Sequence, residues 1–177
     1  MTKTINDVYM QLFRRLKEGG DPMPQLTARE ITAYACKADK KQTAGWSHFY
    51  VEDTTVDYAG LLCDRCLDGE PLAYIIGEWD FYGLRMFCCK GCLIPRPETE
   101  MLVDYAIRAL PRGGHLLDLC TGSGCIAVAV LNNRPDVTAA AVDVSQAALS
   151  YARKNAEYHG IGEDRLELVC TDILDYT

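Results

Sequence analysis

Residues 115–130 read HLLDLCTGSGCIAVAV, and this stretch decides the fold. It starts as an apolar run typical of a strand, turns at two glycines, and continues with the small apolar residues of a buried helix. In α/β proteins, ligands bind at the carboxyl ends of the strands, where such a turn lies. The stretch therefore predicts a strand, a turn and a helix, with a ligand site at the turn.

The alternation of strand and helix patterns continues on both sides of this stretch. A helix pattern precedes it at 98–111, and strand, helix and strand patterns follow at 137–144, 145–160 and 165–174. Strands that alternate with helices predict a parallel, doubly wound sheet.

The first 68 residues predict a small helical bundle. Apolar residues recur every three or four positions at 5–16 and again at 56–67, and residues 43–49 predict a short helix. Thr27 and Glu30 have the spacing of a capping box, which predicts that a further helix starts there.

The stretch between these two parts has a different pattern. Residues 69–97 hold many aromatic and β-branched residues broken by glycines, which predicts strands and a β-hairpin connector. The sequence thus divides into a helical domain at 1–68, a connector at 69–97 and an α/β domain at 98–177.

The composition, 49% apolar and 24% charged, is that of a soluble globular chain. The sequence contains no run of about 20 apolar residues that would span a membrane. Its amino-terminal segment lacks the apolar core of an export signal, so we expect a cytoplasmic protein. Nine cysteines, an odd number, predict reduced thiols rather than a disulfide framework.

The net charge of -7 is unevenly distributed. Residues 1–50 carry 8 Lys and Arg against 5 Asp and Glu, whereas residues 51–177 carry 10 against 20. The acidic body argues against binding to a phosphate backbone, which needs clustered Lys and Arg. The mildly basic front either docks an acidic partner or is a solvated helical surface.

Three acidic residues stand at the ends of three successive predicted strands. Asp143 follows Gly124 by 19 residues, where it can accept hydrogen bonds from the two hydroxyls of a ribose, and Asp172 can hold an adenine amino group. Asp118 directly precedes the glycine turn, where a carboxylate is unfavourable beside a diphosphate but favourable beside a sulfonium. The three acids therefore favour S-adenosylmethionine as the cofactor.

A nicotinamide cofactor stays open at this point, because Gly122, Ser123, Gly124 and Ala127 also fit a relaxed dinucleotide fingerprint. A purely structural reading stays open as well. In that reading the glycines only permit a tight turn, and the acids are solvated strand ends.

Four motifs carry a resemblance to a known family. They are GEPLAYIIGEWDFYG at 69–83, LIPRPETE at 93–100, LLDLCTGSGCIAVAV at 116–130 and AVDVSQAALSYARKNA at 141–156. With these motifs the sequence resembles the HemK-type protein-(glutamine-N5) methyltransferases, which modify peptide-chain release factors. The resemblance covers nearly the whole chain, including the helical front.

The resemblance implies a fold, a cofactor, a partner and a set of site residues. The fold would be α/β: an N-terminal helical bundle, a β-hairpin connector and the first half of a Rossmann-like methyltransferase domain. The helical front would recognise release factors, and Arg96 and Glu98 would shape the junction between domains. Cys120 stands where the family usually has glycine. The residues implied to line the S-adenosylmethionine site are Cys120, Thr121, Gly122, Ser123, Gly124, Asp143, Asp172 and Ile173.

The family's Asn-Pro-Pro-Tyr motif, which orients the target amide after a fourth strand, does not occur before Thr177. An amide nitrogen is a poor nucleophile and depends on being oriented. We therefore assign no catalytic residue, and expect these 177 residues to bind the cofactor weakly and to methylate nothing. Transfer of radiolabel to a release factor would contradict this expectation.

Two Cys-x-x-Cys pairs, Cys63 with Cys66 and Cys89 with Cys92, have the spacing of zinc ligands. Because Cys63 and Cys66 lie on the inward face of a predicted helix, we expect small hydrophobic side chains and no metal site. Three other functions remain open: a methyltransferase for another protein or for nucleic acid, an NAD-dependent enzyme, and a non-catalytic protein-binding adaptor. The histidines without a predicted catalytic or metal role are His48, His115 and His159.

Overall fold

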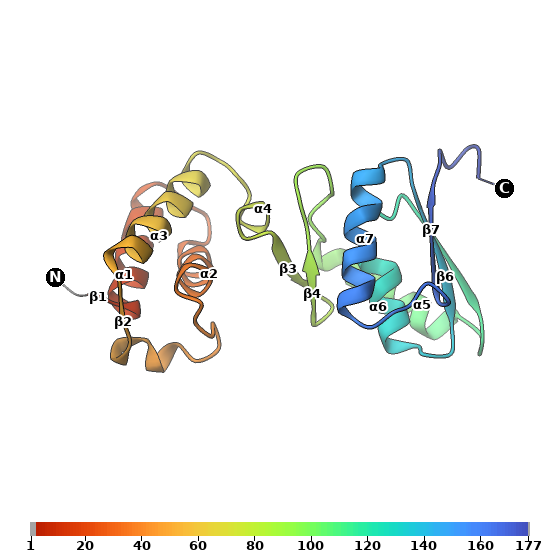
Figure 1. Ribbon diagram of the computed structural model, residues 1–177, viewed down its shortest axis with the longest axis horizontal. Coiled ribbons are helices and arrows are strands. Elements are labelled where there is room, and N and C mark those ends of the chain that lie inside the picture. The colour runs from red at the N-terminus through yellow and green to blue at the C-terminus, as the bar shows by residue number, and fades with distance from the viewer. Residues whose placement is uncertain (1–2, 177) are drawn as a thin grey trace. The chain divides into compact units, whose positions relative to one another are not determined.

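The computed structural model describes residues 3–176, which form two compact units that divide between Ile76 and Gly77 (Figure 1). None of the helices within residues 3–176 combines the length and the apolar character needed to cross a membrane. The elements of the first unit are β1 (Lys3–Thr4), α1 (Ile5–Glu18), α2 (Pro24–Cys36), the 3-10 helix η1 (Thr43–His48), β2 (Tyr50–Val51), α3 (Asp53–Leu67) and α4 (Leu72–Ile76).

Helix α1 begins with a capping box that the sequence analysis did not identify. The Thr4 hydroxyl accepts a hydrogen bond from the Asp7 amide at 3.1 Å, and the Asp7 carboxylate accepts one from the Thr4 amide at 2.8 Å. Each side chain satisfies an amide that the first turn of the helix leaves without a partner.

The predicted capping box at Thr27 and Glu30 is wrong. Helix α2 begins three residues earlier, at Pro24, whose fixed φ and missing N–H suit the first helical position. Thr27 is buried inside the helix, where its hydroxyl lies 3.2 Å from both carboxylate oxygens of Asp21. The residues fitted the spacing, but the proline decides where the helix starts.

The first unit has its own core, made where α1, α2 and α3 pack together. Its largest fully buried side chains are Leu12 and Leu16 on α1, Ile31 on α2 and Leu62 on α3. Leu12, Leu16 and Leu62 lie on the apolar stripes at 5–16 and 56–67 that predicted two of the helices, and the helical bundle is confirmed.

The second unit begins with a β-hairpin and continues with a parallel sheet and its helices. Its elements are β3 (Glu78–Phe81), β4 (Leu84–Phe87), the 3-10 helix η2 (Pro97–Thr99), α5 (Glu100–Ala109), β5 (His115–Leu119), α6 (Cys125–Asn133), β6 (Thr138–Asp143), α7 (Gln146–Tyr158) and β7 (Leu166–Cys170).

The predicted connector, residues 69–97, is divided between the two units. Its first part forms the short helix α4 rather than a strand: the Pro71 carbonyl accepts hydrogen bonds from the Tyr74 and Ile75 amides, and the helix ends before Gly77, which has φ +80. The hairpin β3–β4 belongs to the second unit and pairs Trp79 with Met86. The aromatic and β-branched composition predicted strands throughout, but only the hairpin part forms them.

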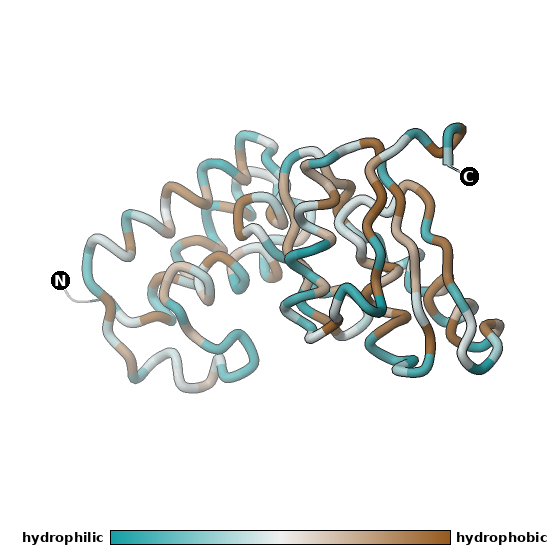
Figure 2. The backbone as a smooth tube through the Cα atoms, turned by 45° about the vertical axis from the view of Figure 1, so that its right-hand side comes forward, coloured by the Kyte–Doolittle hydropathy of each residue, from teal (hydrophilic) through white to brown (hydrophobic). Residues whose placement is uncertain are grey.

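The sheet of the second unit is parallel, as predicted, with strand order β5-β6-β7. Helices α5, α6 and α7 all lie on one side of it (Figure 1), where Ala139, Ala141 and Leu166 of the strands are buried against them. Within residues 3–176 no helix covers the other face, so the described part of the chain contains one of the two helical layers of a doubly wound sheet. On that face Leu117 is 44% exposed and Leu119 is 46% exposed. Figure 2 shows the apolar (brown) stretches along the strands near the C-terminus.

Two arginines hold the turns that lead into the strands. Arg165 donates to the carbonyls of Leu131 and Arg134 at 2.9 and 2.7 Å, at the end of α6. Arg134 in turn donates to the carbonyl of Ile107, at the end of α5, at 2.7 Å. These carbonyls have no helical partner of their own, so the arginines stabilise both helix ends.

Candidate functional site

The glycine turn connects β5 to α6 in a conformation that few residues adopt. Cys120, Gly122 and Gly124 all have positive φ, at 58°, 58° and 77°. Glycine adopts such angles readily, whereas a residue with a Cβ is strained there. The resemblance had implied glycine in place of Cys120, and the structure shows the physical reason.

The two glycines of the turn are required for different reasons. A Cβ on Gly124 would lie 2.8 Å from the Cβ of Ala152, so this glycine allows α7 to pack against the turn. A Cβ on Gly122 would meet nothing within 4 Å, so there is open space beside this residue. Of the two glycines, only Gly122 borders space that a ligand can occupy.

Asp118 lies beneath the turn and is buried, with 7% of its surface exposed. Its Oδ2 accepts hydrogen bonds from the Thr121 hydroxyl at 2.6 Å and from the Ala127 amide, in the first turn of α6, at 3.2 Å. Gly124, at the N-cap of α6, has no side chain to do this, so Asp118 caps the helix from the preceding strand. Burial raises the pKa of the Asp118 carboxyl above its usual value, against the opposing effect of these hydrogen bonds.

Asp143 connects the end of β6 to the glycine turn. Its Oδ2 accepts from the Gly122 amide at 2.8 Å, and its Oδ1 accepts from the Ser145 amide at 2.9 Å. Ser145 in turn caps α7, because its hydroxyl accepts from the Ala148 amide at 3.2 Å. The carboxylate is therefore held in one orientation by two backbone N–H groups.

Asp172 follows the end of β7 and is exposed. Its Oδ1 accepts from the Leu174 amide at 2.9 Å, which forms a turn, and its neighbour Ile173 is 42% exposed. Strand β7 lies next to β6, with Cys170 opposite Asp143, so the ends of these strands are at the same edge of the sheet. The roles implied for Asp172 and Ile173 remain predictions.

The remaining predicted site residues lie in the turn itself and at the start of η2. Thr121 and Ser123 are buried, at 6% and 2% exposure. The Thr121 hydroxyl donates to Asp118, whereas the Ser123 hydroxyl has no hydrogen-bond partner among the described residues. Arg96 and Glu98 are exposed at the start of η2, where the Arg96 carbonyl accepts from the Thr99 amide. Their role at a domain junction remains a prediction.

One important residue was missed by the sequence analysis. Asn155, on α7, is fully buried; its Oδ1 accepts from the Phe87 amide at 2.7 Å. Its Nδ2 donates to the carbonyls of Phe87 at 3.0 Å and Ser123 at 2.9 Å, and so joins the hairpin to the glycine turn. A signal was available, because Asn155 interrupts an apolar stripe on a predicted helix.

The geometry sets what the site can bind. A carboxylate has about four acceptor positions, so Asp143 retains capacity for two further donors, which suits the paired hydroxyls of a ribose. A diphosphate needs the amides at the start of α6, but the Ala127 amide is already bonded to the Asp118 carboxylate. Asp118 would also repel a diphosphate there. The site therefore fits an uncharged or cationic nucleoside better than a dinucleotide.

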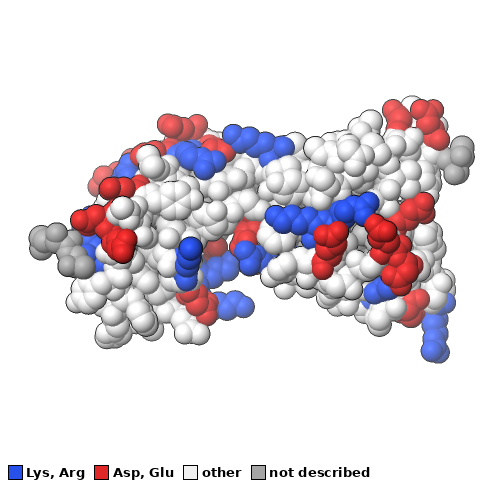
Figure 3. All heavy atoms as spheres, in the orientation of Figure 1, with Lys and Arg blue, Asp and Glu red and all other residues white. Residues whose placement is uncertain are grey.

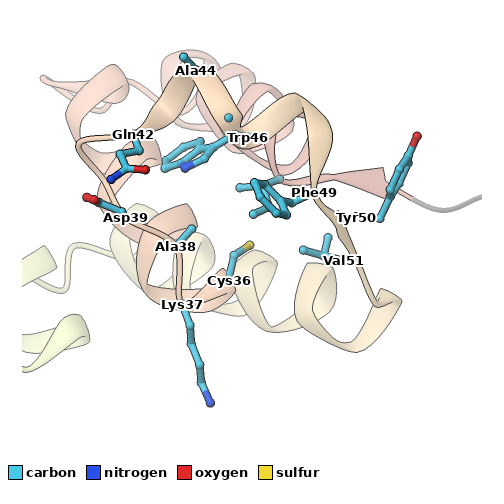
Figure 4. Close-up of a pocket in the computed structure, with 12 residues that line it drawn as sticks. Cys36, Lys37, Ala38, Asp39, Gln42, Ala44, Trp46, Phe49, Tyr50 and Val51 are labelled. Carbon is cyan, nitrogen blue, oxygen red and sulfur yellow. The ribbon is translucent and has the colours of Figure 1, made fainter.

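A separate pocket lies in the first unit (Figure 4). It has a volume of about 690 Å³, and its lining includes Trp46, Phe49 and Ala38. Trp46 is 3% exposed, and its indole N–H has no hydrogen-bond partner among the described residues. Figure 4 shows this nitrogen turned toward Ala38. A buried donor without an acceptor is unfavourable, so the pocket suits an apolar ligand that brings a carbonyl.

The charges bear on the alternative of a nucleic-acid substrate. Residues 77–177 carry 9 Lys and Arg against 14 Asp and Glu. On the face shown in Figure 3, positive and negative side chains lie next to one another in both units. This distribution differs from the basic surface that binding to a phosphate backbone requires.

Two family models match this sequence. The model described as "Methyltransferase small domain" matches residues 97–177, and the one described as "PrmC N-terminal domain" matches residues 7–77. The first covers the glycine turn with its three acidic residues, and the second covers nearly all of the helical unit.

The sequence is also similar to curated proteins named "Release factor glutamine methyltransferase". It is 41% identical to one from Neisseria gonorrhoeae, over 78% of this chain and 50% of that protein. It is 35% identical to one from Nitratidesulfovibrio vulgaris, over 96% of this chain and 57% of that protein. The chain thus spans about half the length of the curated relatives it matches.

Among solved structures, the chain is similar to a SAM-dependent methyltransferase from Geobacter sulfurreducens in complex with S-adenosyl-L-homocysteine. The two are 28% identical with a TM-score of 0.40, and the match covers 46% of this chain and 32% of that one.

Proposed function

The chain belongs to the release factor glutamine methyltransferase family, and we propose from this that it supplies the cofactor site and the substrate-docking unit of such an enzyme. In the proposal, the whole enzyme transfers a methyl group from S-adenosylmethionine to the glutamine side-chain amide in the Gly-Gly-Gln motif of peptide-chain release factors.

The observation that carries the cofactor proposal is the pair of carboxylates around the glycine turn. Asp143 is fixed by the amides of Gly122 and Ser145 and retains acceptor capacity for a ribose. Asp118 holds the start of α6 and places a negative charge beneath the turn. A negative charge there favours a sulfonium and disfavours a diphosphate.

In this proposal each residue of the chain has a limited task. S-adenosylmethionine, when bound, supplies a methyl group on a positively charged sulfur. Asp143 binds the ribose, Gly122 leaves room beside it, and Asp172 and Ile173 border the adenine. Asp118 keeps the turn in place through Thr121 and adds electrostatic attraction for the positive charge.

Calorimetric titration of the 177-residue chain tests the cofactor. We expect S-adenosylhomocysteine to bind and NAD not to bind. Asp143→Ala should weaken the binding of S-adenosylhomocysteine by about tenfold, because two hydrogen bonds to the ribose are lost. Binding of NAD in place of S-adenosylhomocysteine would overturn the proposal in favour of the dinucleotide alternative.

The Asp118→Asn variant tests the role of the negative charge. S-adenosylmethionine carries a positive charge on sulfur, whereas S-adenosylhomocysteine does not. We expect the variant to bind S-adenosylmethionine about fivefold more weakly, a change of about 1 kcal/mol, and to bind S-adenosylhomocysteine unchanged. Equal losses for both ligands would show that Asp118 acts only by supporting the turn.

The first unit supports the partner part of the proposal. Its pocket combines aromatic and aliphatic walls with the indole N–H of Trp46, which lacks an acceptor. An apolar side chain of a release factor, with a neighbouring main-chain carbonyl for Trp46, would satisfy both features. The cytoplasmic location expected from the sequence belongs to the same proposal, because translation termination takes place there.

Binding of the chain to a purified release factor tests this docking. Trp46→Phe removes the N–H and leaves a smaller ring, so we expect binding at least about fivefold weaker, of which the loss of one hydrogen bond accounts for about 1 kcal/mol. Tyr58→Phe, which changes an exposed aromatic on α3, is the control and should bind as the unchanged chain does. If Trp46→Phe bound the release factor as tightly as the unchanged chain, this pocket would be excluded as the docking site. Docking without any binding of S-adenosylhomocysteine would favour the adaptor alternative.

A further inference from the structure

A cysteine pair lies in a tight turn directly after β4. The Cys92 amide donates to the Cys89 carbonyl at 3.1 Å, and Gly91 has φ +106, so residues 89–92 form a β-turn. The two sulfur atoms lie 4.0 Å apart. All nine cysteines are in the thiol form in the structure.

This geometry is close to that of a disulfide. The ends of a β-turn have Cα atoms less than about 7 Å apart, and disulfides join Cα atoms about 4.4–6.8 Å apart. A bond of about 2.05 Å requires the sulfur atoms of Cys89 and Cys92 to approach by about 2 Å, which side-chain rotation within the turn can supply.

We propose that Cys89 and Cys92 are a reversible modification site, at which a low-molecular-weight disulfide oxidises the two thiols to an intramolecular disulfide. Cys89 is half-buried whereas Cys92 is 2% exposed, so Cys89 reacts first. Cys92 is close enough to complete the reaction.

The reaction balances in two exchanges. In the first, the Cys89 thiolate attacks one sulfur of the small disulfide; a mixed disulfide forms and one small thiolate leaves. In the second, the Cys92 thiolate attacks the Cys89 sulfur, and the second small thiolate leaves. The protons of Cys89 and Cys92 pass to the two released thiolates. Two protein thiols are oxidised, and one small disulfide is reduced to two thiols.

The surroundings favour the oxidised form once it has formed. Burial, with the neighbouring Cys89 as a second cause, raises the pKa of Cys92 to about 12. The Cys92 thiolate is therefore not stabilised in the reduced protein, in contrast to strongly oxidising dithiols whose reduced form is stabilised. The same effect makes the second exchange slow near neutral pH, because little thiolate is present.

The turn is joined to the candidate cofactor site through Asn155. Phe87, two residues before Cys89, exchanges two hydrogen bonds with Asn155, which also binds the carbonyl of Ser123 in the glycine turn. Cys92 also interacts electrostatically with Asp143. We therefore expect oxidation to weaken binding at that site, and this second part rests on the proposed function.

The chain contains a matched control. Cys63 and Cys66 have the same spacing, but they lie on α3. Side chains three apart on a helix have Cβ atoms about 5–6 Å apart, whereas a disulfide needs about 3.5–4.5 Å. This pair cannot close unless the helix opens, so it should react far more slowly.

Tryptic mapping after treatment with oxidised glutathione tests the proposal. Trypsin cleaves after Lys90 and after Arg65, so each pair falls into two peptides that only a disulfide keeps joined. We expect the joined peptides of the 89–92 pair to form at least about tenfold faster than those of the 63–66 pair. Cys89→Ser should abolish them, and Cys88→Ser should not.

Three results would overturn the modification site. They are equal rates for the two pairs, glutathione adducts that persist on Cys89 even when the pH is raised to populate the Cys92 thiolate, and joined peptides that survive in Cys89→Ser. The last result would assign the bond to Cys88, the other thiol in the same peptide.

Titration with S-adenosylhomocysteine before and after oxidation tests the connection to the site. We expect binding at least about fivefold weaker after oxidation, restored by reduction, and unchanged in Cys89→Ser. Equal binding by both forms would overturn the connection. If neither form binds but the joined peptides appear, the proposed cofactor fails while the modification site stands.

Discussion

Cys120 is the residue of the glycine turn that fits its backbone conformation least well. It has φ 58° and is exposed, so no packing of its side chain offsets the strain. A residue with a Cβ in this region is strained by about 1–2 kcal/mol. Cys120→Gly should therefore raise the free energy of unfolding of the second unit by about 1 kcal/mol, measured by urea denaturation.

Gly122 allows the reverse substitution to be tested, because it has the same φ as Cys120 and open space around it. Gly122→Ala should lower the free energy of unfolding by about 1 kcal/mol, through the backbone alone. If Cys120→Gly lowered stability as well, the side chain of Cys120 would have a stabilising contact that the structure does not show.

The pKa of Asp118 gives a pH dependence with a definite sign. Because burial raises the pKa of this carboxyl in the folded state, ionisation disfavours the folded state. The contribution of Asp118 to stability is largest below its unfolded pKa, near 3.9, and is lost as the pH rises through the folded value. Asp118→Asn should therefore raise the melting temperature at pH 7, and the gain should disappear as the pH falls below about 4. A gain that is constant with pH would contradict this.

At this scale, the sequence predicted which residues surround the turn but not what each one does. Gly122 and Gly124 look equivalent in the sequence, yet one borders open space and the other borders Ala152. That difference depends on how closely α7 approaches the turn, and no local pattern encodes it. For the same reason Asp118, expected to face the cofactor, also proved to be the cap of α6.

Asn155 joins three elements of the second unit, because its side chain binds both backbone groups of Phe87 on β4 and the carbonyl of Ser123 before α6. Asn155→Ala leaves these buried groups without their partner. Each such group is destabilising by about 1–3 kcal/mol, so we expect a loss of about 3 kcal/mol in the free energy of unfolding, measured by urea denaturation.

The control for this change is Asn132→Ala on α6, where the side chain is exposed. It should change stability by less than about 0.5 kcal/mol. If Asn155→Ala also lowered the free energy of unfolding by less than about 0.5 kcal/mol, water would have to replace the side-chain amide in all three hydrogen bonds.

Most elements could be predicted from periodicity, since α1, α3, α5 and α7 carry clear apolar stripes. Helix α6 is buried along consecutive residues, and its position after the glycine turn indicated it. The errors lie where one residue overrides composition. Pro24 starts α2 ahead of the apparent capping box. Pro71 directly precedes α4, which lies within a stretch whose aromatic and β-branched residues are typical of strands. In both cases proline, which cannot donate a backbone hydrogen bond, sets the boundary.

The second unit as a whole has an apolar sheet face and a sheet edge that remain open within residues 3–176. Strand β5 pairs only with β6, and Leu117 and Leu119 are exposed on the uncovered face. Such surfaces promote association between chains. We expect sedimentation velocity to show that the 177-residue chain self-associates as its concentration rises. Leu117→Lys should raise the dissociation constant of this association about tenfold.

Leu61→Lys is the matched control for this effect. Leu61 is also an exposed leucine, at 63%, but it lies on α3 in the other unit. Association should persist in this variant. If Leu61→Lys abolished association while Leu117→Lys left it intact, the contact between chains would lie on the helical unit instead.

Because each unit has its own core, tryptophan fluorescence can follow the unfolding of each unit separately. The protein contains two tryptophans, Trp46 in the core of the first unit and Trp79 on β3 of the second. Fluorescence emission from a chain with Trp46→Phe therefore follows the unfolding of the sheet unit alone, and emission from Trp79→Phe follows the helical unit alone. If each unit melts on its own, the two emission curves will have different midpoints, and a single ligand will displace only one of them.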